Sequence, residues 1–112
     1  MELETTRSGD VVIAEACTRV DSTNAREFER TLMRLAGGAD RGMVVDCEGL
    51  AYISSAGLRA VLLVRKSLKS QGKRFAMCGL GHPIREVFAI SGFEKIIPLF
   101  GSRDAAVARV SS

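Results

Sequence analysis

The segment VVDCEGLAYISSAGLRAVLLVRK, residues 44–66, decides the fold because it joins the clearest strand of the sequence to its clearest helix. Residues 42–47 form a short, largely apolar run, GMVVDC, which is typical of a buried strand. A helical pattern begins near Ser55, continues to Lys69 and stops at Gln71–Gly72. This order of strand, loop and helix predicts one unit of a layered α/β fold.

The residues before this segment predict a hairpin and a helix. The first expected strand lies within 2–6, and β-branched residues predict a second strand over 11–20. In the next stretch, Asn24 is an expected cap and Glu27 follows three residues later, which is the spacing of a capping box. Apolar residues then recur at helical spacing up to Gly37, so we expect an amphipathic helix.

The residues after the central segment predict two more strands and two more helices. They are a strand over 74–80, a helix that opens with Pro83 and closes at Gly92, an edge strand over 96–100, and a helix capped by Ser102. Strands that alternate with helices after a hairpin imply a mixed sheet with right-handed crossovers. We therefore expect a single α/β domain, residues 1–112, with about four or five strands and about four helices packed against the sheet.

Size and composition favour binding over catalysis. The chain has 112 residues, of which 46% are hydrophobic and 26% are charged, and this is ordinary for one globular domain. A domain of this size buries a core but has little room for a deep cleft framed by several loops.

Charge and hydropathy argue against nucleic acid and membrane partners. The formal net charge is +3, but the basic residues are interleaved with acidic ones. We interpret the densest basic stretch, residues 65–74, as a solvated helix end and turn. No apolar run approaches the roughly 20 residues of a membrane span, and the N-terminus does not resemble a signal peptide. We expect a soluble, cytoplasmic protein with no membrane insertion and no direct contact with nucleic acid.

Cysteine and histidine positions predict no metal site, no cofactor and no enzyme. Cys17, Cys47 and Cys78 lie about thirty residues apart, outside zinc or redox spacing, and should behave as small hydrophobic side chains. His82 is the only histidine and precedes a proline at another expected helix start. No G-x-S-x-G elbow is present, so a hydrolase that uses Ser55 would lack its base.

On a helical wheel, the central helix carries one clear apolar stripe. Its members are Gly57, Val61, Val64 and Leu68. Leu58 and Leu62 lie on the flank of this stripe, where the pattern favours ordinary core positions over a margin beside the serines.

The two serines at the start of this helix have two interpretations. A serine at the cap position accepts from the free N–H groups of the first turn, and capping serines are by far the more common kind. A hydroxyl on Ser55 would also lie near the positive end of the helix dipole, where a phosphate is tolerated. Phosphorylation there would add about −1.5 to −2 charges to the surface that a partner meets, without unfolding the helix.

The central segment resembles a known family. It is similar to the strand, loop and helix of the STAS domain, which bacterial anti-sigma factor antagonists share with the cytoplasmic ends of sulphate transporters. The resemblance extends to RVDSTNAREFE before the first helix and to FAMCGLGHPIREVFAISGFEKIIPLF towards the end. It implies a STAS-like fold over nearly the whole chain.

The motif of the antagonists usually reads Asp-Ser-Ser/Thr-Gly-Leu, and the serine after the aspartate is phosphorylated. Here Ser54 stands at the aspartate position, Ser55 at the phosphorylated position and Ala56 next to it, while Gly57 and Leu58 match. The resemblance therefore implies phosphorylation on Ser55, with Ser54 as the less favoured choice.

The resemblance also implies a surface that binds a partner. Asp21, in RVDS, matches a family aspartate near the phosphorylation site, and Thr18 stands where the family often has glycine. The expected partner-binding residues are Asp21, Ser54, Ser55, Ala56, Gly57, Leu58 and Leu62.

The implied function is partner switching in the control of transcription. In this hypothesis the unphosphorylated protein binds a serine-kinase anti-sigma factor with a histidine-kinase-like ATPase fold, phosphorylation of Ser55 breaks the contact, and a PP2C-type phosphatase resets it. The alternative is a structural STAS subunit of a membrane-associated lipid or anion transport complex. In that complex the same helix would dock constitutively.

Overall fold

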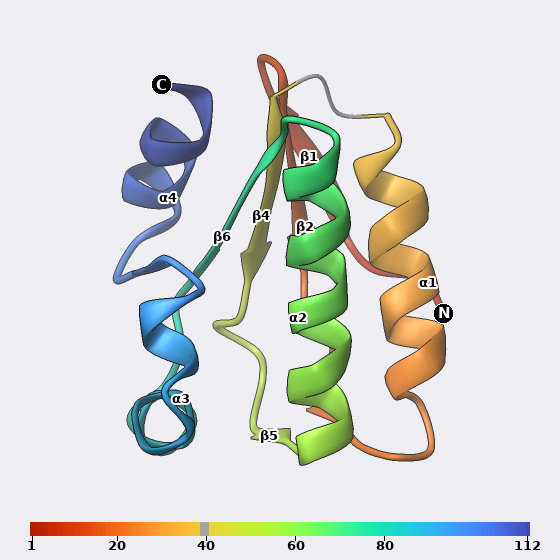
Figure 1. Cartoon of the computed structure of the whole chain (residues 1–112), viewed down its shortest axis with the longest axis vertical. Coiled ribbons are helices and arrows are strands. Elements are labelled where there is room, and N and C mark those ends of the chain that lie inside the picture. The colour runs from red at the N-terminus through yellow and green to blue at the C-terminus, as the bar shows by residue number, and fades with distance from the viewer. Residues whose placement is uncertain (39–40) are drawn as a thin grey trace.

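The computed structural model describes residues 1–38 and 41–112, and it places five strands in one mixed sheet (Figure 1). Their order is β1-β2-β4-β6-β7. β1 runs antiparallel to β2, and every other pair of neighbours is parallel. The strands are β1 (Thr5–Ser8), β2 (Val11–Glu15), β4 (Gly42–Asp46), β6 (Arg74–Cys78) and β7 (Leu99–Phe100). The expected mixed sheet of an α/β fold is confirmed.

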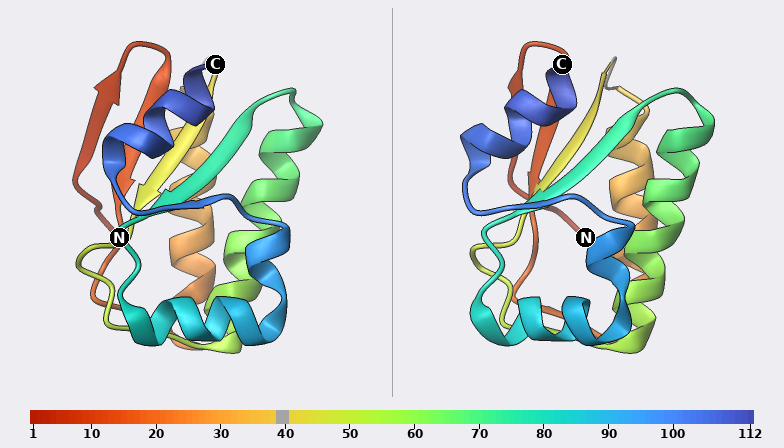
Figure 2. Two further views of the ribbon diagram at one scale, coloured as in Figure 1. Left: turned by 90° about the vertical axis from the view of Figure 1, so that its left-hand side faces the viewer. Right: turned by 60° about the vertical axis from the view of Figure 1, so that its left-hand side comes forward.

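Helices cover both faces of this sheet. They are α1 (Ala25–Ala36), α2 (Ser55–Ser70), α3 (His82–Ser91) and α4 (Arg103–Ser111). α1 and α2 lie side by side on one face, α4 lies on the other, and α3 crosses the end of the molecule at which α2 begins (Figures 1 and 2). No helix in the described residues has both the length and the apolar character needed to cross a bilayer.

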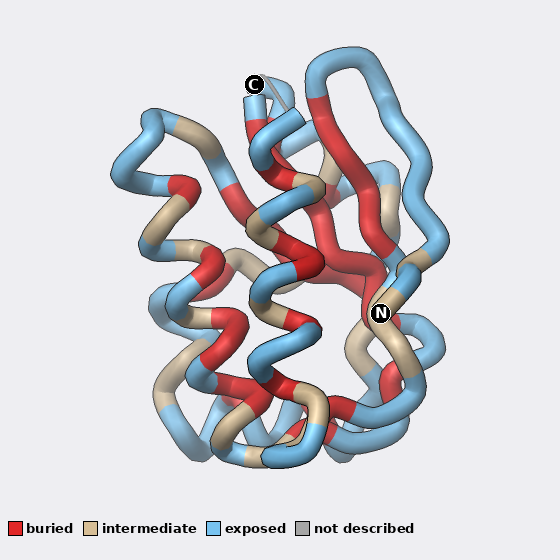
Figure 3. Tube along the Cα trace, turned by 90° about the vertical axis from the view of Figure 1, so that its right-hand side faces the viewer, coloured by how far each residue is buried: buried red, intermediate tan, exposed pale blue. Residues whose placement is uncertain are grey.

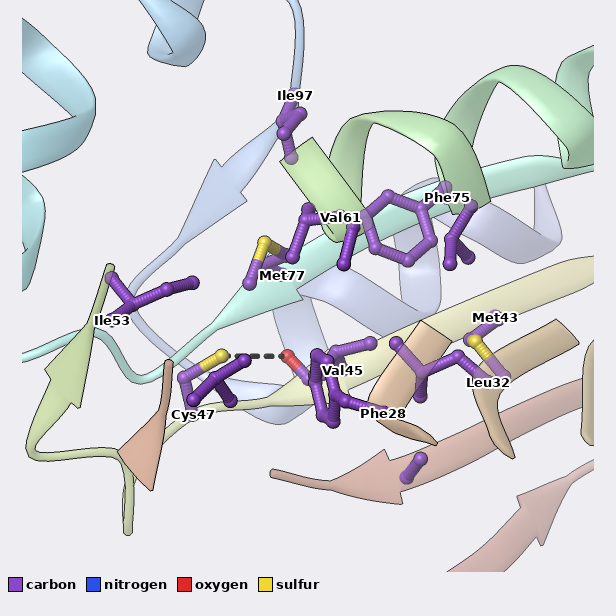
Figure 4. Close-up of a cluster of buried hydrophobic side chains, with 14 of the residues drawn as sticks. Phe28, Leu32, Met43, Val45, Cys47, Ile53, Val61, Phe75, Met77 and Ile97 are labelled. Atoms are coloured by element: carbon purple, nitrogen blue, oxygen red, sulfur yellow. Dashed lines mark hydrogen bonds between the residues drawn. The ribbon is translucent and has the colours of Figure 1, made fainter. Parts of the chain in front are cut away.

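The strands bury both of their faces because successive side chains point in opposite directions. The face toward α1 and α2 buries Val12, Met43, Val45, Phe75 and Met77. The face toward α4 buries Val11, Ile13, Val44, Ala76 and Cys78. Figure 3 shows the central strands as buried over most of their length, and Figure 4 shows side chains of the core between the sheet and the helices α1 and α2. Burial on both faces explains the nearly unbroken apolar run of β4.

A salt bridge fastens α4 to the sheet. Arg103, in the first turn of α4, donates from Nε and Nη2 to Oδ2 of Asp46, over 2.9 and 2.8 Å. Asp46 is only 7% exposed, and its Oδ1 also accepts from the backbone N–H of Glu48. A buried carboxylate is tolerated only when it is paired and hydrogen-bonded in this way.

The predicted strand over 11–20 is wrong in its second half. β2 ends at Glu15, and β3 (Arg19–Val20) leaves the main sheet to pair in parallel with β5 (Tyr52–Ile53). This two-stranded sheet was not predicted. Each strand has only two residues, which is too short to show a periodicity in the sequence.

The predicted capping box at the start of α1 is also wrong. Asn24 holds the N-cap position, but its side chain makes no capping bond. Its Oδ1 instead accepts from the backbone N–H of Asp21, and its Nδ2 donates to the carbonyl of Arg19. The side chain therefore stabilises the loop before the helix rather than the helix itself.

Further strand boundaries differ from the prediction. β1 covers Thr5–Ser8 rather than residues 2–6, since Thr5 to Ser8 are the residues that pair with β2. β6 ends at Cys78 rather than at residue 80, because Gly79 has a φ of 72°, which a strand cannot continue through. The last strand is shorter than the expected 96–100, since a 3₁₀ turn, η1 (Phe93–Lys95), precedes it. The backbone N–H groups of Ile96 and Ile97 both donate to Phe93, which keeps them out of the sheet.

Candidate functional site

Ser54 and Ser55 have different roles at the start of α2. Ser54 is the N-cap, and its Oγ accepts from the backbone N–H of Gly57 over 3.3 Å. Its own N–H donates to the carbonyl of Val20 over 2.9 Å, which ties the cap to β3. Ser55, the first helical residue, is exposed, and among the described residues its hydroxyl has no hydrogen-bond partner. The cap predicted for Ser54 is confirmed, and Ser55 offers its hydroxyl to solvent.

Gly57 sets how closely α2 approaches the small β3–β5 sheet. A Cβ atom at this position would lie 2.6 Å from Cγ1 of Ile53 and 2.9 Å from Cγ1 of Val20. Both neighbours are stiff β-branched side chains that are themselves buried. Glycine therefore lets the first turn of α2 rest directly on this sheet, which fixes where Ser55 stands.

Asp21 lies in the turn between β3 and α1, and its carboxylate is held by several donors. Oδ1 accepts from the hydroxyl and the backbone N–H of Thr23, and Oδ2 accepts from Nε of Arg19 over 2.7 Å. The hydrogen bonds from Thr23, followed by the one from Arg19, lower the pKa of Asp21 to about 2. The carboxylate is thus charged at neutral pH and has a fixed orientation.

Arg19 and Tyr52 form a contact that the sequence analysis missed. They are register partners in the β3–β5 ladder, and the Arg19 guanidinium lies 4.3 Å from the centroid of the Tyr52 ring. An arginine over an aromatic face is a cation–π pair. Tyr52 is 43% exposed, so this pair adds an amphipathic surface two residues before the Ser54 cap. The only sequence signal was Tyr52 itself, the single tyrosine of the chain.

The other predicted partner-binding residues differ in exposure. Ala56 and Leu62 are half-buried, while Gly57 and Leu58 are buried, with Leu58 only 7% exposed. The core position that the helical pattern favoured for Leu58 is confirmed. A direct partner contact through Gly57 or Leu58 stays a prediction, and their positions indicate that they support the surface from beneath.

A groove of about 600 Å³ runs between α1 and α2 and reaches the start of both helices. Its wall from α1 and the preceding loop consists of Ser22, Ala25, Arg26, Glu29 and Arg30, and its wall from α2 consists of Ala56, Arg59, Ala60 and Leu63. Arg59 stands one turn after Ser55, on the same side of the helix. Three arginines against one glutamate make this groove positive next to the exposed serine.

The described part of the chain has no cluster of side chains suited to metal binding. No group of three or more His, Cys, Asp or Glu side chains in residues 1–38 and 41–112 could hold a metal ion. The His82 side chain is 84% exposed and faces Glu86 on α3, with Nε2 3.8 Å from Oε1. The cysteines are free thiols, and burial raises the pKa of Cys78 to about 11 and that of Cys47 further still. In Figure 4 the Cys47 thiol donates to the carbonyl of Val45 inside the core.

Comparison with known proteins identifies relatives of the whole domain. The sequence profile of the STAS domain matches residues 2–106. Over 89 residues the chain is 46% identical to BtrV of Bordetella bronchiseptica, which is named for an expected role as an anti-sigma factor antagonist. That alignment covers 80% of this chain and 77% of the relative.

Solved structures show the same fold at low sequence identity. An anti-sigma factor antagonist from Mycobacterium paratuberculosis superposes with a TM-score of 0.88 at 18% identity, over 99% of this chain and 94% of that one. The Bacillus cell fate determinant SpoIIAA in its phosphorylated form gives a TM-score of 0.71 at 18% identity, over 97% of this chain and 99% of that one. These similarities support the fold expected from the sequence.

Proposed function

Because the chain belongs to the STAS domain family, we propose that it acts as an anti-sigma factor antagonist whose binding to its partner is controlled by phosphorylation of Ser55. The relatives are named as anti-sigma factor antagonists, which is a regulatory role and not that of an enzyme. The observation that carries the proposal is the contrast at the start of α2, where the Ser54 hydroxyl is engaged in the cap and that of Ser55 is exposed.

This contrast favours Ser55 over Ser54 as the phosphorylation site. A kinase acting on Ser54 would have to break the bond from Gly57 and would meet a half-buried hydroxyl. Ser55 can be reached without disturbing the helix. A phosphate at the first helical position also lies near the unpaired N–H groups and the positive end of the dipole, so the fold tolerates it.

Phosphorylation of Ser55 should weaken binding of the partner rather than change the fold. A dianion brought into an interface must be desolvated and repels any acidic group opposite, which costs several kcal/mol unless cations meet it. The partner proposed here is a serine-kinase anti-sigma factor with a histidine-kinase-like ATPase fold, acting in the cytoplasm. Its contact surface comprises the exposed Ser55, the fixed carboxylate of Asp21 and the Arg19–Tyr52 pair.

A reversible switch requires removal of the phosphate from Ser55, and the enzyme proposed for this step is a PP2C-type phosphatase. Such an enzyme requires access to the phosphate, and the exposure of Ser55 is compatible with that. The rival role, a structural STAS subunit of a membrane-associated lipid or anion transport complex, uses the same helix without modification. In the rival case, substitution of Ser55 would leave assembly unchanged.

The test combines phosphorylation and binding. The protein is incubated with its cognate anti-sigma factor and ATP, the phosphorylated residue is mapped by mass spectrometry, and complex formation is measured for Ser55→Ala and Ser55→Asp. We expect one phosphate on Ser55, sustained binding by Ser55→Ala, and a loss of affinity of about 100-fold for Ser55→Asp.

Ser54→Asp is the matched control, because aspartate caps a helix as well as serine does and adds the same charge one residue away. It should fold and keep most of the affinity. Equal binding by wild type and Ser55→Asp, or a phosphate mapped elsewhere, would contradict the switch and favour the constitutive subunit.

A further inference from the structure

A concave surface at the C-terminal end of α2, separate from the groove between α1 and α2, has no part in the proposed function. We call it the basic hollow. This basic hollow has a volume of about 620 Å³. Its lining residues come from the last turns of α2, the start of β6, the segment around η1 and the end of α4. They are Arg65, Lys69, Lys73, Arg74, Phe75, Glu94, Lys95, Ile96, Pro98, Arg109 and Ser112. In Figure 1 the end of α2 and the C-terminus of the chain lie at the same end of the molecule, opposite the start of α2.

The basic hollow gathers more net positive charge than the whole chain carries. Counted over side chains, six cations against one acidic residue, Glu94, leave the hollow with five net positive charges, more than the formal +3 of all side chains of the chain. The remainder of the molecule is therefore net acidic. Residues 65–74 were interpreted above as a solvated helix end, and that interpretation misses Lys95 and Arg109, which the fold brings beside them from distant parts of the chain.

These cations lack internal counter-charges. Within residues 1–38 and 41–112, none of the six forms an ion pair with a carboxylate. Two are held by neutral oxygens: Lys73 Nζ donates to the carbonyl of Ala36 over 3.1 Å, and Arg74 Nη1 donates to the carbonyl of Arg109 over 3.0 Å. Preorganised cations without carboxylate partners are what an anionic ligand requires.

The ends of the helices explain only part of this charge. α2 and α4 both finish at the hollow, and cations near a helix C-terminus offset its negative dipole. Each helix end is equivalent to about half a negative charge, so together they account for about one of the five charges. Lys95 is the last residue of the 3₁₀ turn η1, whose three residues are too few to build a substantial dipole, so its charge is not explained in this way.

We propose that the basic hollow binds a small polyanion that carries several phosphate groups. A concave site gathered from four segments suits a compact ligand better than the flat face of a protein. Arginine presents a planar fork that matches phosphate oxygens bidentately, and lysine adds point charges around it. The hollow lies along α2 from Ser55, at a distance set by a helix about 24 Å long, so the two sites are separate. This inference does not depend on the proposed function.

The experiment is a titration of the ¹⁵N-labelled protein with sodium tripolyphosphate, followed by amide chemical shifts in NMR spectra at low and at high salt. We expect saturable shifts at amides of the hollow, among them Lys69, Phe75 and Lys95, while those around Ser55 stay in place. Lys69→Gln and Lys95→Gln should each weaken binding by about tenfold, the loss expected for one charge-assisted hydrogen bond. Both side chains are exposed, so the variants should give the spectrum of a folded protein.

Lys66→Gln is the matched control, because Lys66 is an exposed lysine of the same helix that lies outside the hollow. It removes the same charge and should leave the affinity unchanged. Shifts spread over the whole surface, or equal weakening by Lys66→Gln, would overturn the site, since both indicate attraction to net charge only. Citrate tests the ligand class: equal affinity for this polycarboxylate would overturn the assignment to phosphate.

Discussion

The two ends of α2 differ in the interactions that surround them. At its start, position is fixed by shape: Ser54 caps the first turn, Gly57 rests on Val20 and Ile53, and a backbone bond ties the cap to β3. At its end, cations from four segments surround a hollow, and none of them is paired with a carboxylate within the described residues. The comparison teaches that the start of α2 is sensitive to volume and hydrogen bonding, whereas its end is sensitive to charge.

The largest effect on stability should come from Gly57→Ala. The new methyl group would overlap Ile53 and Val20, and overpacking of this kind costs about 1–3 kcal/mol, which the better helix propensity of alanine offsets only in part. We expect urea unfolding to show a net loss of about 1–2 kcal/mol. Gly101→Ala is the control, because a Cβ there meets nothing within 4 Å. Equal stability of the two variants would mean that the start of α2 is not fixed by shape.

A smaller loss is expected from Ser54→Ala, which removes the cap of α2. Loss of an N-cap side chain costs about 1 kcal/mol. The matched comparison is Ser102→Ala at the start of α4, where Oγ of Ser102 accepts from Ala105 over 3.2 Å. Thermal or urea unfolding should give similar losses for both, and Ser54→Asp should restore stability. If Ser54→Asp were as unstable as Ser54→Ala, capping would not be the role of this residue.

The smallest effect concerns the charge of Asp21. Its pKa is lowered to about 2 in the folded protein from an ordinary 3.8, so its contribution to stability is full above about pH 4 and is lost as the pH falls toward 2. NMR titration of the Asp21 carboxylate should give a midpoint near 2, and Arg19→Gln should raise it. Lys66→Gln, a charge change far from this turn, should leave the midpoint in place. A midpoint unmoved by Arg19→Gln would show that the hydrogen bonds from Thr23 suffice.

Local signals were predictable from the sequence, and contacts between distant residues were not. The Ser54 cap, the buried stripe from Gly57 to Leu68 and the end of α3 at Gly92 each depend on a few adjacent residues, and the structure has them as expected. The capping box at Asn24 failed because a neighbouring turn competes for the same side chain.

The site was predictable only as far as its motif extends. The resemblance to the STAS domain predicts Ser54, Ser55 and Asp21 as site residues, and this stays a prediction. Ser54 and Ser55 lie at the start of α2, and Asp21 follows Val20, whose carbonyl accepts from the backbone N–H of Ser54. The Arg19–Tyr52 pair depends on two strands of two residues each, whose pairing no local pattern indicates. The basic hollow depends on Lys95 and Arg109 lying beside residues 65–74, which only the tertiary fold establishes.

The salt bridge between Arg103 of α4 and Asp46 of β4 also affects the tendency of the protein to aggregate. Among the described residues, α4 is the helix that packs on its face of the sheet, so its detachment alone would uncover the apolar strip that includes Val11, Val44 and Ala76. Such local opening requires less free energy than global unfolding and is measured by hydrogen exchange. The uncovered strands would be templates for association with other copies. We therefore expect loss of Arg103 to favour aggregation of the protein and, because Arg109 of α4 lines the basic hollow, to disturb that hollow as well.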